Sequence, residues 1–541
     1  MLFTFFQKVI YNRKTSMKKN LVSSGIKLSF LTMISRVLGL VREMTKARFL
    51  GTGALADAFG IAFLIPNLLR RLFAENSISV AFIPTFKEYL ESGKKREETR
   101  EFVCATFTLV SFLTAIVVCA GILAAPVLVR IFLKSEETAL VAETSLLTRI
   151  MFPYLFVISV AACFQGILNG ENIFLPSGFT PILFNLCVIF GTYILSPKMA
   201  NPARAMSVGV IAGGFLQAAF QLPFVFKCGW PIKFISLKKT FSNPGTKKVV
   251  ALIVPTIIGM ASYQLNDLIS TALAGRCGEG VVSSLQYSLR LQELILGVFA
   301  VSIGTVILPD LSSFAKHGQW SEYNSMLTWA IKIIALITIP ITFYSLITGR
   351  EIIQLVYKSR RFDDTSVALT LSAFTFHIAG LFFIALNRIV SPAFYAQGNT
   401  KLPTLAGIIS MAADIILSFA LSFKWRGAGI AFALSAASFA NTVLLFAFLK
   451  KMRTIDVGGV VKSSVIYTAK MILISIAASA PAFFAHKFFV QKFSALGRFF
   501  GNGIPLALTL LVFAATEILI LAATRDETVA RFFKKKKIKN S

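Results

Sequence analysis

Three arginines lie within stretches that are otherwise as apolar as a membrane span. Arg36 and Arg42 belong to a long helical segment near the N-terminus, and Arg290 lies in the second half of the chain. At 100° per residue, one arc of about 120° contains Arg36, Gly39, Arg42 and Glu43, and the opposite face carries Leu, Ile and Val. Ionised groups at membrane depth are costly, so they usually face a hydrated cavity or a charged partner. Three guanidinium groups around one cavity would suit a polyanionic ligand, because guanidinium pairs bidentately with phosphate.

Simpler explanations exist for some of these cations. Lys46 and Arg48 lie nearer the helix end, and we expect their side chains to extend to the lipid headgroups. Arg36 is deeper in the segment, which favours the cavity. Arg290 has Glu293 one turn further on, so a local ion pair is the alternative to a place in the cavity.

The second apolar segment is bracketed by Asp57, Arg70 and Arg71. A carboxylate in a first helical turn is favourable without any function, so a cap and a functional pair are equal alternatives for Asp57. Arg70 and Arg71 either extend to the headgroups or turn inward, if Pro66 and the residue after it break the helix. All three are candidate substrate-binding residues, together with Arg36, Arg42 and Arg290.

Two acids, Asp267 and Asp414, lie near the middle of later apolar segments. Cation coordination and proton relay are common reasons for a carboxylate at that depth. The alternative is a protonated acid that makes a hydrogen bond between helices. The sequence predicts no cofactor, and Na⁺ or H⁺ is the coupling ion that these acids would serve.

Composition and motifs exclude several classes of function. The net charge is +30, but Lys and Arg gather in short stretches between apolar segments and at both ends, without nucleic-acid-binding motifs. The six cysteines contain no CxxC pair, and the three histidines are far apart, so no metal framework is expected. No Gly-rich phosphate loop, nucleophile motif or carboxylate dyad is present, which makes an enzyme improbable.

The bulk properties predict an all-α polytopic membrane protein. Of 541 residues, 55% are hydrophobic and 15% charged, and the mean hydropathy is +0.73. We expect about fourteen spans by length and hydropathy, with 77–91 and 310–316 as amphipathic surface pieces. The expected spans are 24–49, 54–73, 101–127, 143–168, 174–196, 205–227, 249–275, 283–308, 324–348, 368–396, 403–423, 427–449, 461–486 and 502–524.

Basic clusters predict the orientation. An even number of spans places both termini on one side of the membrane. The basic clusters at the N-terminus, 94–96, 238–248, 450–453 and 534–539 then share that side, which the positive-inside rule makes cytoplasmic. One basic stretch, 358–361, falls on the opposite side.

An internal repeat divides the chain. Residues 82–102 match 306–327 at an offset of 225, pairing Pro84 with Pro309, and 172–177 match 399–404 at an offset of 227. The offset spans six helices, so the halves keep one orientation, a layout found in secondary transporters. The predicted parts are a basic cytoplasmic N-terminus (1–23), a first lobe (24–228), a basic cytoplasmic linker (229–248), a second lobe (249–450), two further spans (451–525) and a basic cytoplasmic tail (526–541).

The segment SRVLGLVREMTKARFLGTGALADAFGIAFLIPNLLRRLFAENSISVAFIP strongly resembles the signature of the MurJ (MviN) family of lipid II flippases, within the multidrug/oligosaccharidyl-lipid/polysaccharide exporter superfamily. The segments YSLRLQEL, GTVILPDLS and FYAQGNTKLP extend the resemblance along the chain. Glu43 departs from it, since many members have Asp there.

The resemblance implies fourteen helices, two six-helix lobes around a central cavity, and two final helices whose groove holds a lipid tail. It implies export of undecaprenyl-diphosphate-linked peptidoglycan precursor, lipid II, from the cytoplasmic to the periplasmic leaflet of the bacterial inner membrane. By position, the family's cavity arginines correspond to Arg36, Arg42 and Arg290, and its acid in the second span to Asp57. Its cation site lies on helices seven and eleven, where Asp267 and Asp414 are found.

Two alternatives stay open. An exporter of another polyprenyl-linked oligosaccharide, or a multidrug antiporter of the same superfamily, would share the fold, but a drug antiporter would want an acidic cavity. A scaffold for cell-wall enzymes would not need buried arginines. The partners expected are lipid II and membrane lipids, with cell-wall synthesis proteins as further candidates and nucleic acid excluded.

Overall fold

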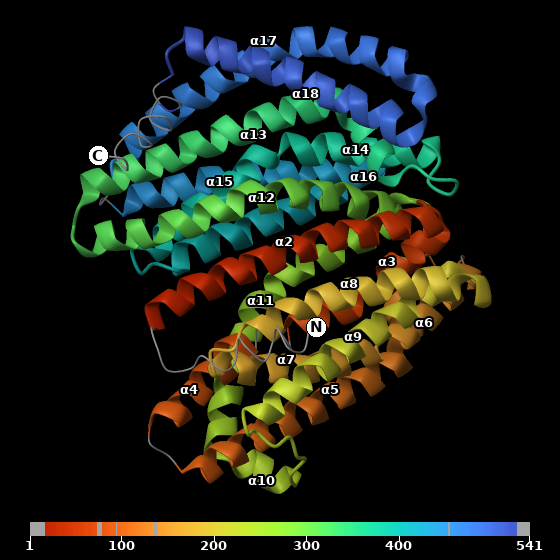
Figure 1. The fold of residues 1–541 in the computed structure, drawn as a ribbon, viewed down its shortest axis with the longest axis vertical. Helices are drawn as coiled ribbons and strands as arrows, with labels where there is room; N and C mark the ends of the chain where they lie inside the picture. The colour runs from red at the N-terminus through yellow and green to blue at the C-terminus, as the bar shows by residue number, and fades with distance from the viewer. Residues whose placement is uncertain are drawn as a thin grey trace. The chain divides into compact units, whose positions relative to one another are not determined.

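The computed structural model describes residues 17–72, 78–92, 95–134, 136, 138–452, 455–526 and 528, and every regular element within them is a helix (Figure 1). Most of the predicted basic ends, 1–23 and 526–541, lies outside the described residues, which begin at 17 and include only 526 and 528 of the tail. The chain divides into two compact units. Of the described residues, the first unit takes those up to Arg42, Ile65–Ala125 and Leu146–Met260, and the second takes the rest.

The first unit is built on helices that pack closely through small residues. α8 (Leu175–Leu195) packs along α9 (Pro202–Lys227), which also packs against α7 (Pro153–Gly170). A Cβ on Gly191 would lie 3.1 Å from the Cα of Gly209. Small residues at such crossings let helix backbones approach within a membrane, where apolar burial alone does not drive helices together. The unit also holds η2 (Ile78–Phe82), α4 (Ile83–Glu91), η3 (Ser196–Lys198) and α10 (Leu237–Ser242).

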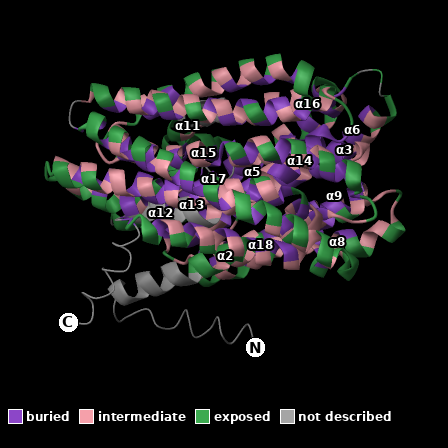
Figure 2. Cartoon of the chain, turned by 90° about the horizontal axis from the view of Figure 1, so that it is seen from above, coloured by how far each residue is buried: buried purple, intermediate pink, exposed green. Residues whose placement is uncertain are grey.

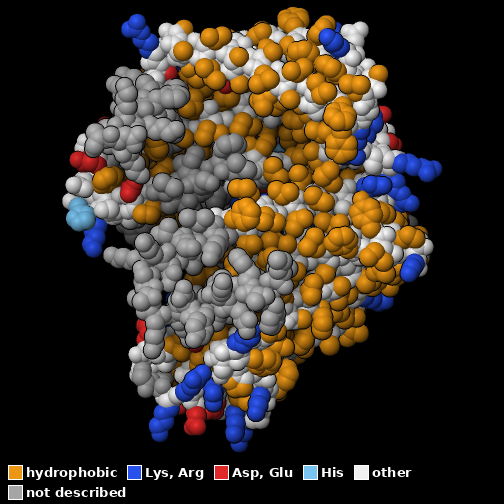
Figure 3. Space-filling view, viewed as in Figure 1, with side chains coloured by type: hydrophobic (Ala, Val, Ile, Leu, Met, Phe, Trp, Pro, Cys, Tyr) orange, Lys and Arg blue, Asp and Glu red, His pale blue; other side chains and the backbone are white. Residues whose placement is uncertain are grey.

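The second unit is built around α12 (Val281–Lys316) and α13 (Trp320–Tyr357). α17 (Val457–Phe493) packs on α13 and on α18 (Gly497–Ala523), with Met471 and Ile474 in a shared apolar cluster. Large apolar side chains cover the outer faces of α17 and α18 (Figure 3), and many residues of these helices are exposed (Figure 2). They include Leu473, which is 67% exposed, and Phe484, which is 72% exposed. Such exposure is expected of helices that face lipid. The other helices are α14 (Asp364–Ala379), α15 (Leu381–Tyr395), α16 (Lys401–Lys451) and η4 (Ser494–Leu496).

Four helices pass from one unit to the other: α2 (Met17–Leu50), α3 (Ala54–Arg70), α5 (Arg96–Phe132) and α11 (Pro244–Arg276). α6 (Thr138–Met151) also contributes to both. Residues 43–64 and 126–145 therefore belong with the second unit although they come from the first half of the chain.

The helices agree with the predicted spans, and the all-α class is confirmed. Each expected span coincides with a helix or with a bent helix pair. Seven described segments are long and apolar enough to cross a membrane, or eight if α14 and α15, bent by 43°, form one span. Two of the seven each contain two expected spans, because α16 is kinked at Arg426 (φ 48°) and α17 is followed closely by α18. A count of fourteen is consistent with this but is not established by it.

The amphipathic pieces differ from expectation in one place. η2 and α4 cover 78–91, as expected, but 310–316 forms the last turns of α12 rather than a separate element. Pro309 lies inside that helix without ending it.

Gly51 joins α2 to α3 and is expected to be intolerant of any side chain. Its φ is +64°, and a Cβ there would lie 2.1 Å from the carbonyl oxygen of Arg361. Gly51→Ala should cost about 1–3 kcal/mol and lower the melting temperature of the purified protein. Gly407→Ala is the matched control, because a Cβ on Gly407 meets nothing within 4 Å. Equal melting temperatures for the two variants would contradict the expectation.

Candidate functional site

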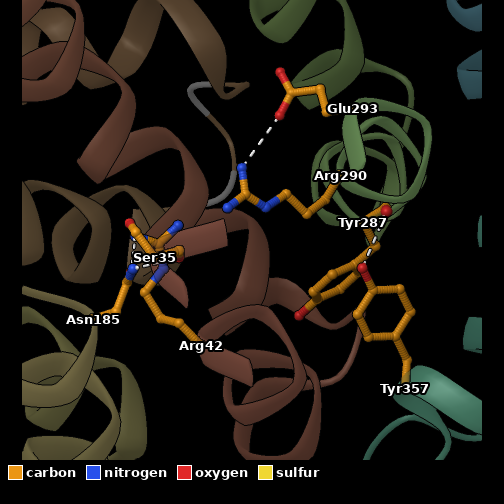
Figure 4. Close-up of polar contacts among 7 residues, drawn as sticks. All are labelled: Ser35, Arg42, Asn185, Tyr287, Arg290, Glu293 and Tyr357. Carbon is orange, nitrogen blue, oxygen red and sulfur yellow. Dashed lines mark hydrogen bonds and ion pairs between the residues drawn. The ribbon is translucent and has the colours of Figure 1, made fainter. Parts of the chain in front are cut away.

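Arg42 is held in the first unit by a side chain from α8. Its Nη1 donates to Asn185 Oδ1 at 3.2 Å, and Asn185 Nδ2 donates to the carbonyl oxygen of Ser35 at 3.2 Å (Figure 4). The guanidinium also lies 5.7 Å from the centre of the Phe184 ring. Asn185 is buried and Arg42 is half-buried. The arrangement fixes the orientation of a cation at this point of α2.

Arg36, Arg70 and Arg71 also lie in the first unit and are all half-buried. Arg36 precedes Arg42 by six residues, or about 9 Å along α2. Arg70 Nε donates to Asn67 Oδ1 at 3.1 Å within α3. α3 continues through Pro66 to Arg70, so the helix break considered there does not occur.

Arg290 lies in the second unit on α12. Its Nη1 is 3.2 Å from Glu293 Oε2, which is the local ion pair considered from the sequence (Figure 4). The two side chains are 30% and 57% exposed, so the pair contributes little to stability. One turn earlier on α12, the Tyr287 carbonyl oxygen accepts a hydrogen bond from the Tyr357 hydroxyl at 3.2 Å, which fixes α12 against α13.

Asp57 caps a helix, but not the one on which it lies. The side chain starts from the first turn of α3, is 4% exposed, and accepts hydrogen bonds from the backbone N–H of Gly280 at 2.7 Å and of Ser283 at 2.8 Å. These donors are at the start of α12, whose N-terminus carries a partial positive charge. Asp57 therefore fixes the helix that carries Arg290.

Lys46 differs from expectation. Its side chain is 4% exposed and does not extend to the headgroups. Its Nζ donates to Gln286 Oε1 at 2.7 Å and lies 5.0 Å from the centre of the Tyr287 ring and 5.8 Å from that of Phe59. The amide oxygen and the two ring faces replace water around the ammonium group. Arg48 is exposed, as expected.

The two deep acids lie near each other in the second unit. Asp414, on α16, accepts hydrogen bonds from Asn266 Nδ2 at 2.7 Å and from Ser418 Oγ at 3.3 Å. Asp267 is half-buried, and its charge acts on Asp414. The other amide atom, Asn266 Oδ1, is buried and has no hydrogen-bond partner among the residues that the structure describes. A set of carboxylate, amide and hydroxyl oxygens with one unsatisfied acceptor fits a hard cation.

The structure groups these residues by unit. Arg36, Arg42, Arg70 and Arg71 belong to the first, while Asp57, Arg290, Asp267 and Asp414 belong to the second. The sequence reasoning did not identify the amide partners Asn185, Gln286 and Asn266. The only available signal was a lone amide in an apolar run, which rarely distinguishes a site residue from a helix contact.

The comparisons with known proteins agree with one another. Residues 46–500 match the family model described as lipid II flippase MurJ. A probable lipid II flippase MurJ of Treponema pallidum is 45% identical over 515 residues, covering 94% of this chain and 97% of the relative. One from Vibrio cholerae is 33% identical, covering 80% and 83%.

Solved structures give the same result. A lipid II flippase MurJ in an inward closed conformation has a TM-score of 0.75 at 25% identity, covering 92% of this chain and 99% of that one. An inward-facing multidrug resistance MATE family transporter of the MOP superfamily has a TM-score of 0.63 at 14% identity, covering 81% and 98%, which shows a shared fold. The chain belongs to the MurJ family of lipid II flippases.

Proposed function

We propose that this protein moves lipid II, the undecaprenyl-diphosphate-linked peptidoglycan precursor, from the cytoplasmic to the periplasmic leaflet. The observation that carries the proposal is the family match over residues 46–500, which includes Asp57 and Arg290. It is supported by half-buried Arg42 on α2, whose guanidinium is oriented by Asn185. The protein is a transporter rather than an enzyme, since flipping changes no covalent bond of the substrate.

The mechanism we propose is alternating access. Arg36, Arg42 and Arg290 bind the diphosphate, because guanidinium groups pair bidentately with phosphate oxygens. Arg70 and Arg71 are secondary candidates for the same role. The polyprenyl chain stays in lipid, and the exposed apolar faces of α17 and α18 support a place for it there. The headgroup is released after the transporter reopens on the other side.

The orientation we propose places both termini in the cytoplasm and the helices in the bacterial inner membrane. The basic clusters of the sequence support it through the positive-inside rule. Membrane lipids are the surrounding partners, and cell-wall synthesis proteins are candidates because they use the product of flipping.

We also propose that Asp414, Asp267, Asn266 and Ser418 would hold a coupling cation, Na⁺, with H⁺ as the alternative. When bound, the cation would offset one of the two negative charges of the deep carboxylates, which are costly in a membrane. The unsatisfied Asn266 Oδ1 favours Na⁺, because a proton on Asp414 would leave that acceptor unused.

Asp414→Asn tests the coupling ion. Wild-type protein in vesicles should flip lipid II faster when NaCl replaces choline chloride, and the variant should lose that stimulation. Asp310→Asn, an exposed acid near the end of α12, is the control and should keep it. If wild-type flipping ignores Na⁺ but follows a pH gradient, H⁺ is the ion instead.

The function is tested in bacteria depleted of their own flippase and supplied with this protein. A periplasmic enzyme that cleaves lipid II reports how much has reached the outer leaflet. We expect wild-type protein to restore cleavage. A well-expressed protein that restores none would indicate another polyprenyl-linked substrate.

A further inference from the structure

A group of cations gathers at one end of the second unit. Arg48 lies in the last turn of α2, and Arg498 in the first turn of α18. Between α13 and α14, the loop carries Lys358, Arg360 and Arg361, and Arg350 lies two turns before the end of α13. These six residues are called the basic cluster. Figure 3 shows Lys and Arg side chains gathered at the right-hand edge, where Figure 1 places the α13–α14 loop.

Backbone contacts hold the cluster in place. Arg361 packs directly on the α2–α3 turn, because its carbonyl oxygen occupies the space that a Cβ on Gly51 would need. Ser359 Oγ donates to the Ala47 carbonyl oxygen at 3.4 Å. The α13–α14 loop is therefore fixed against the last turn of α2, the helix that also carries Arg36 and Arg42.

Arg498 brings the start of α18 to the same place. Its Nη2 donates to the carbonyl oxygens of Leu355 at 2.8 Å and Val356 at 2.7 Å, at the end of α13. Arg48 lies close enough to Arg498 for the two charges to interact. Two guanidinium groups from opposite ends of the chain are thus held near each other, which favours an anion at that point.

The neighbouring carboxylates do not balance this charge. Asp364 lies 2.8 Å from Lys358 and 3.8 Å from Arg350, and Asp363 caps α14 by accepting from the Ser366 N–H at 2.8 Å. The lysine lowers the pKa of Asp364, and the Ser366 hydrogen bonds lower that of Asp363, so both are ionised at neutral pH. A third carboxylate, Glu279, lies at the α2–α3 turn, where its Oε1 accepts from the Ala54 N–H at 2.8 Å. The six cations of the cluster outnumber these three described carboxylates. Arg360 and Arg361 are exposed.

In the orientation proposed above, the cluster lies on the periplasmic side. Basic residues there do not serve the positive-inside rule, which concerns cytoplasmic loops. We propose that the basic cluster is a second anion site, which binds the diphosphate of the lipid after its headgroup has crossed the membrane. This inference rests on the proposed function. Several guanidinium groups from different elements suit a diphosphate better than one phosphate, because each can bind a separate pair of oxygens.

The test uses full-length protein in lipid nanodiscs, with Arg290→Ala as the background so that binding at the first site is weakened. Native mass spectrometry measures the binding of undecaprenyl diphosphate and, for comparison, of phosphatidylglycerol. Adding Arg360→Ser and Arg361→Ser should weaken diphosphate binding about fivefold or more. The matched control adds Lys238→Ser and Lys239→Ser, two exposed lysines of α10, and should bind as the background does.

Two results would overturn the proposal: unchanged diphosphate binding in the cluster variant, or an equal loss of phosphatidylglycerol binding, which would indicate general attraction of anionic lipid. Melting temperatures show whether the variant with both Arg360→Ser and Arg361→Ser is folded. If that variant is unfolded, Arg360→Ser alone is used in its place. The proposed function fails separately, if wild-type protein restores no lipid II cleavage in flippase-depleted cells.

Discussion

Arg290→Ala is expected to abolish lipid II flipping while leaving the protein folded. The guanidinium is 30% exposed and paired only with Glu293 on its own helix among the contacts described, so its loss removes little stability. Hydrogen bonds to a charged group contribute about 1.5–3 kcal/mol, so diphosphate affinity should fall about tenfold to a hundredfold. Flipping in flippase-depleted cells and protein level in their membranes are the measurements.

Two variants sharpen this prediction. Arg290→Lys keeps the charge but loses bidentate pairing, so it should flip more slowly than wild type and faster than Arg290→Ala. Glu293→Gln breaks the same ion pair while keeping the cation, so it should flip normally. If Glu293→Gln fails as Arg290→Ala does, the ion pair rather than the cation is what matters, and the diphosphate assignment is wrong.

Asp57→Ala is expected to lower both stability and flipping. The variant would leave the Gly280 and Ser283 N–H groups without their acceptor at a buried site. Each buried donor left unsatisfied costs about 1–3 kcal/mol, and the favourable charge at the α12 N-terminus is lost as well. The melting temperature of purified protein and lipid II cleavage in cells should fall together, with Asp57→Asn between wild type and Asp57→Ala.

Asp363→Ala provides the comparison. Asp363 makes the same kind of contact at the start of α14 but is exposed, so its loss should cost about 1 kcal/mol. A variant of Asp57 that melts like wild type but does not flip would contradict a role in fixing α12 and would place the carboxylate on the substrate.

The fold class and the helix positions could be predicted because hydropathy and length are local properties. Each apolar segment of membrane length became helical. Pro66 and Pro309 lie inside helices, which membrane helices tolerate because neighbouring groups satisfy the freed backbone carbonyl. The kink in α16 at Arg426 (φ 48°) falls between the two spans expected there, 403–423 and 427–449, so this boundary also agrees with the prediction.

The site could be predicted only in part, because partners distant in sequence decide each side chain's environment. Lys46 was expected near the headgroups from its place in the helix, but Gln286, 240 residues away, accepts its hydrogen bond. For Asp57, the sequence left a helix cap and a functional pair as equal alternatives. The carboxylate caps α12, and this could not be predicted because it depends on where α12 begins in space. The local pair of Arg290 and Glu293 needs no distant partner, and it was one of the two alternatives that the sequence predicted for Arg290.

The most direct test of the central claim is flipping by purified protein in vesicles that contain fluorescent lipid II. A membrane-impermeant quencher added outside removes the signal of the outer leaflet alone unless lipid II crosses. Wild-type protein should allow quenching of both leaflets, and Arg290→Ala should leave the inner leaflet protected. Inner-leaflet protection with folded wild-type protein, or equal crossing of fluorescent phosphatidylglycerol, would contradict the account.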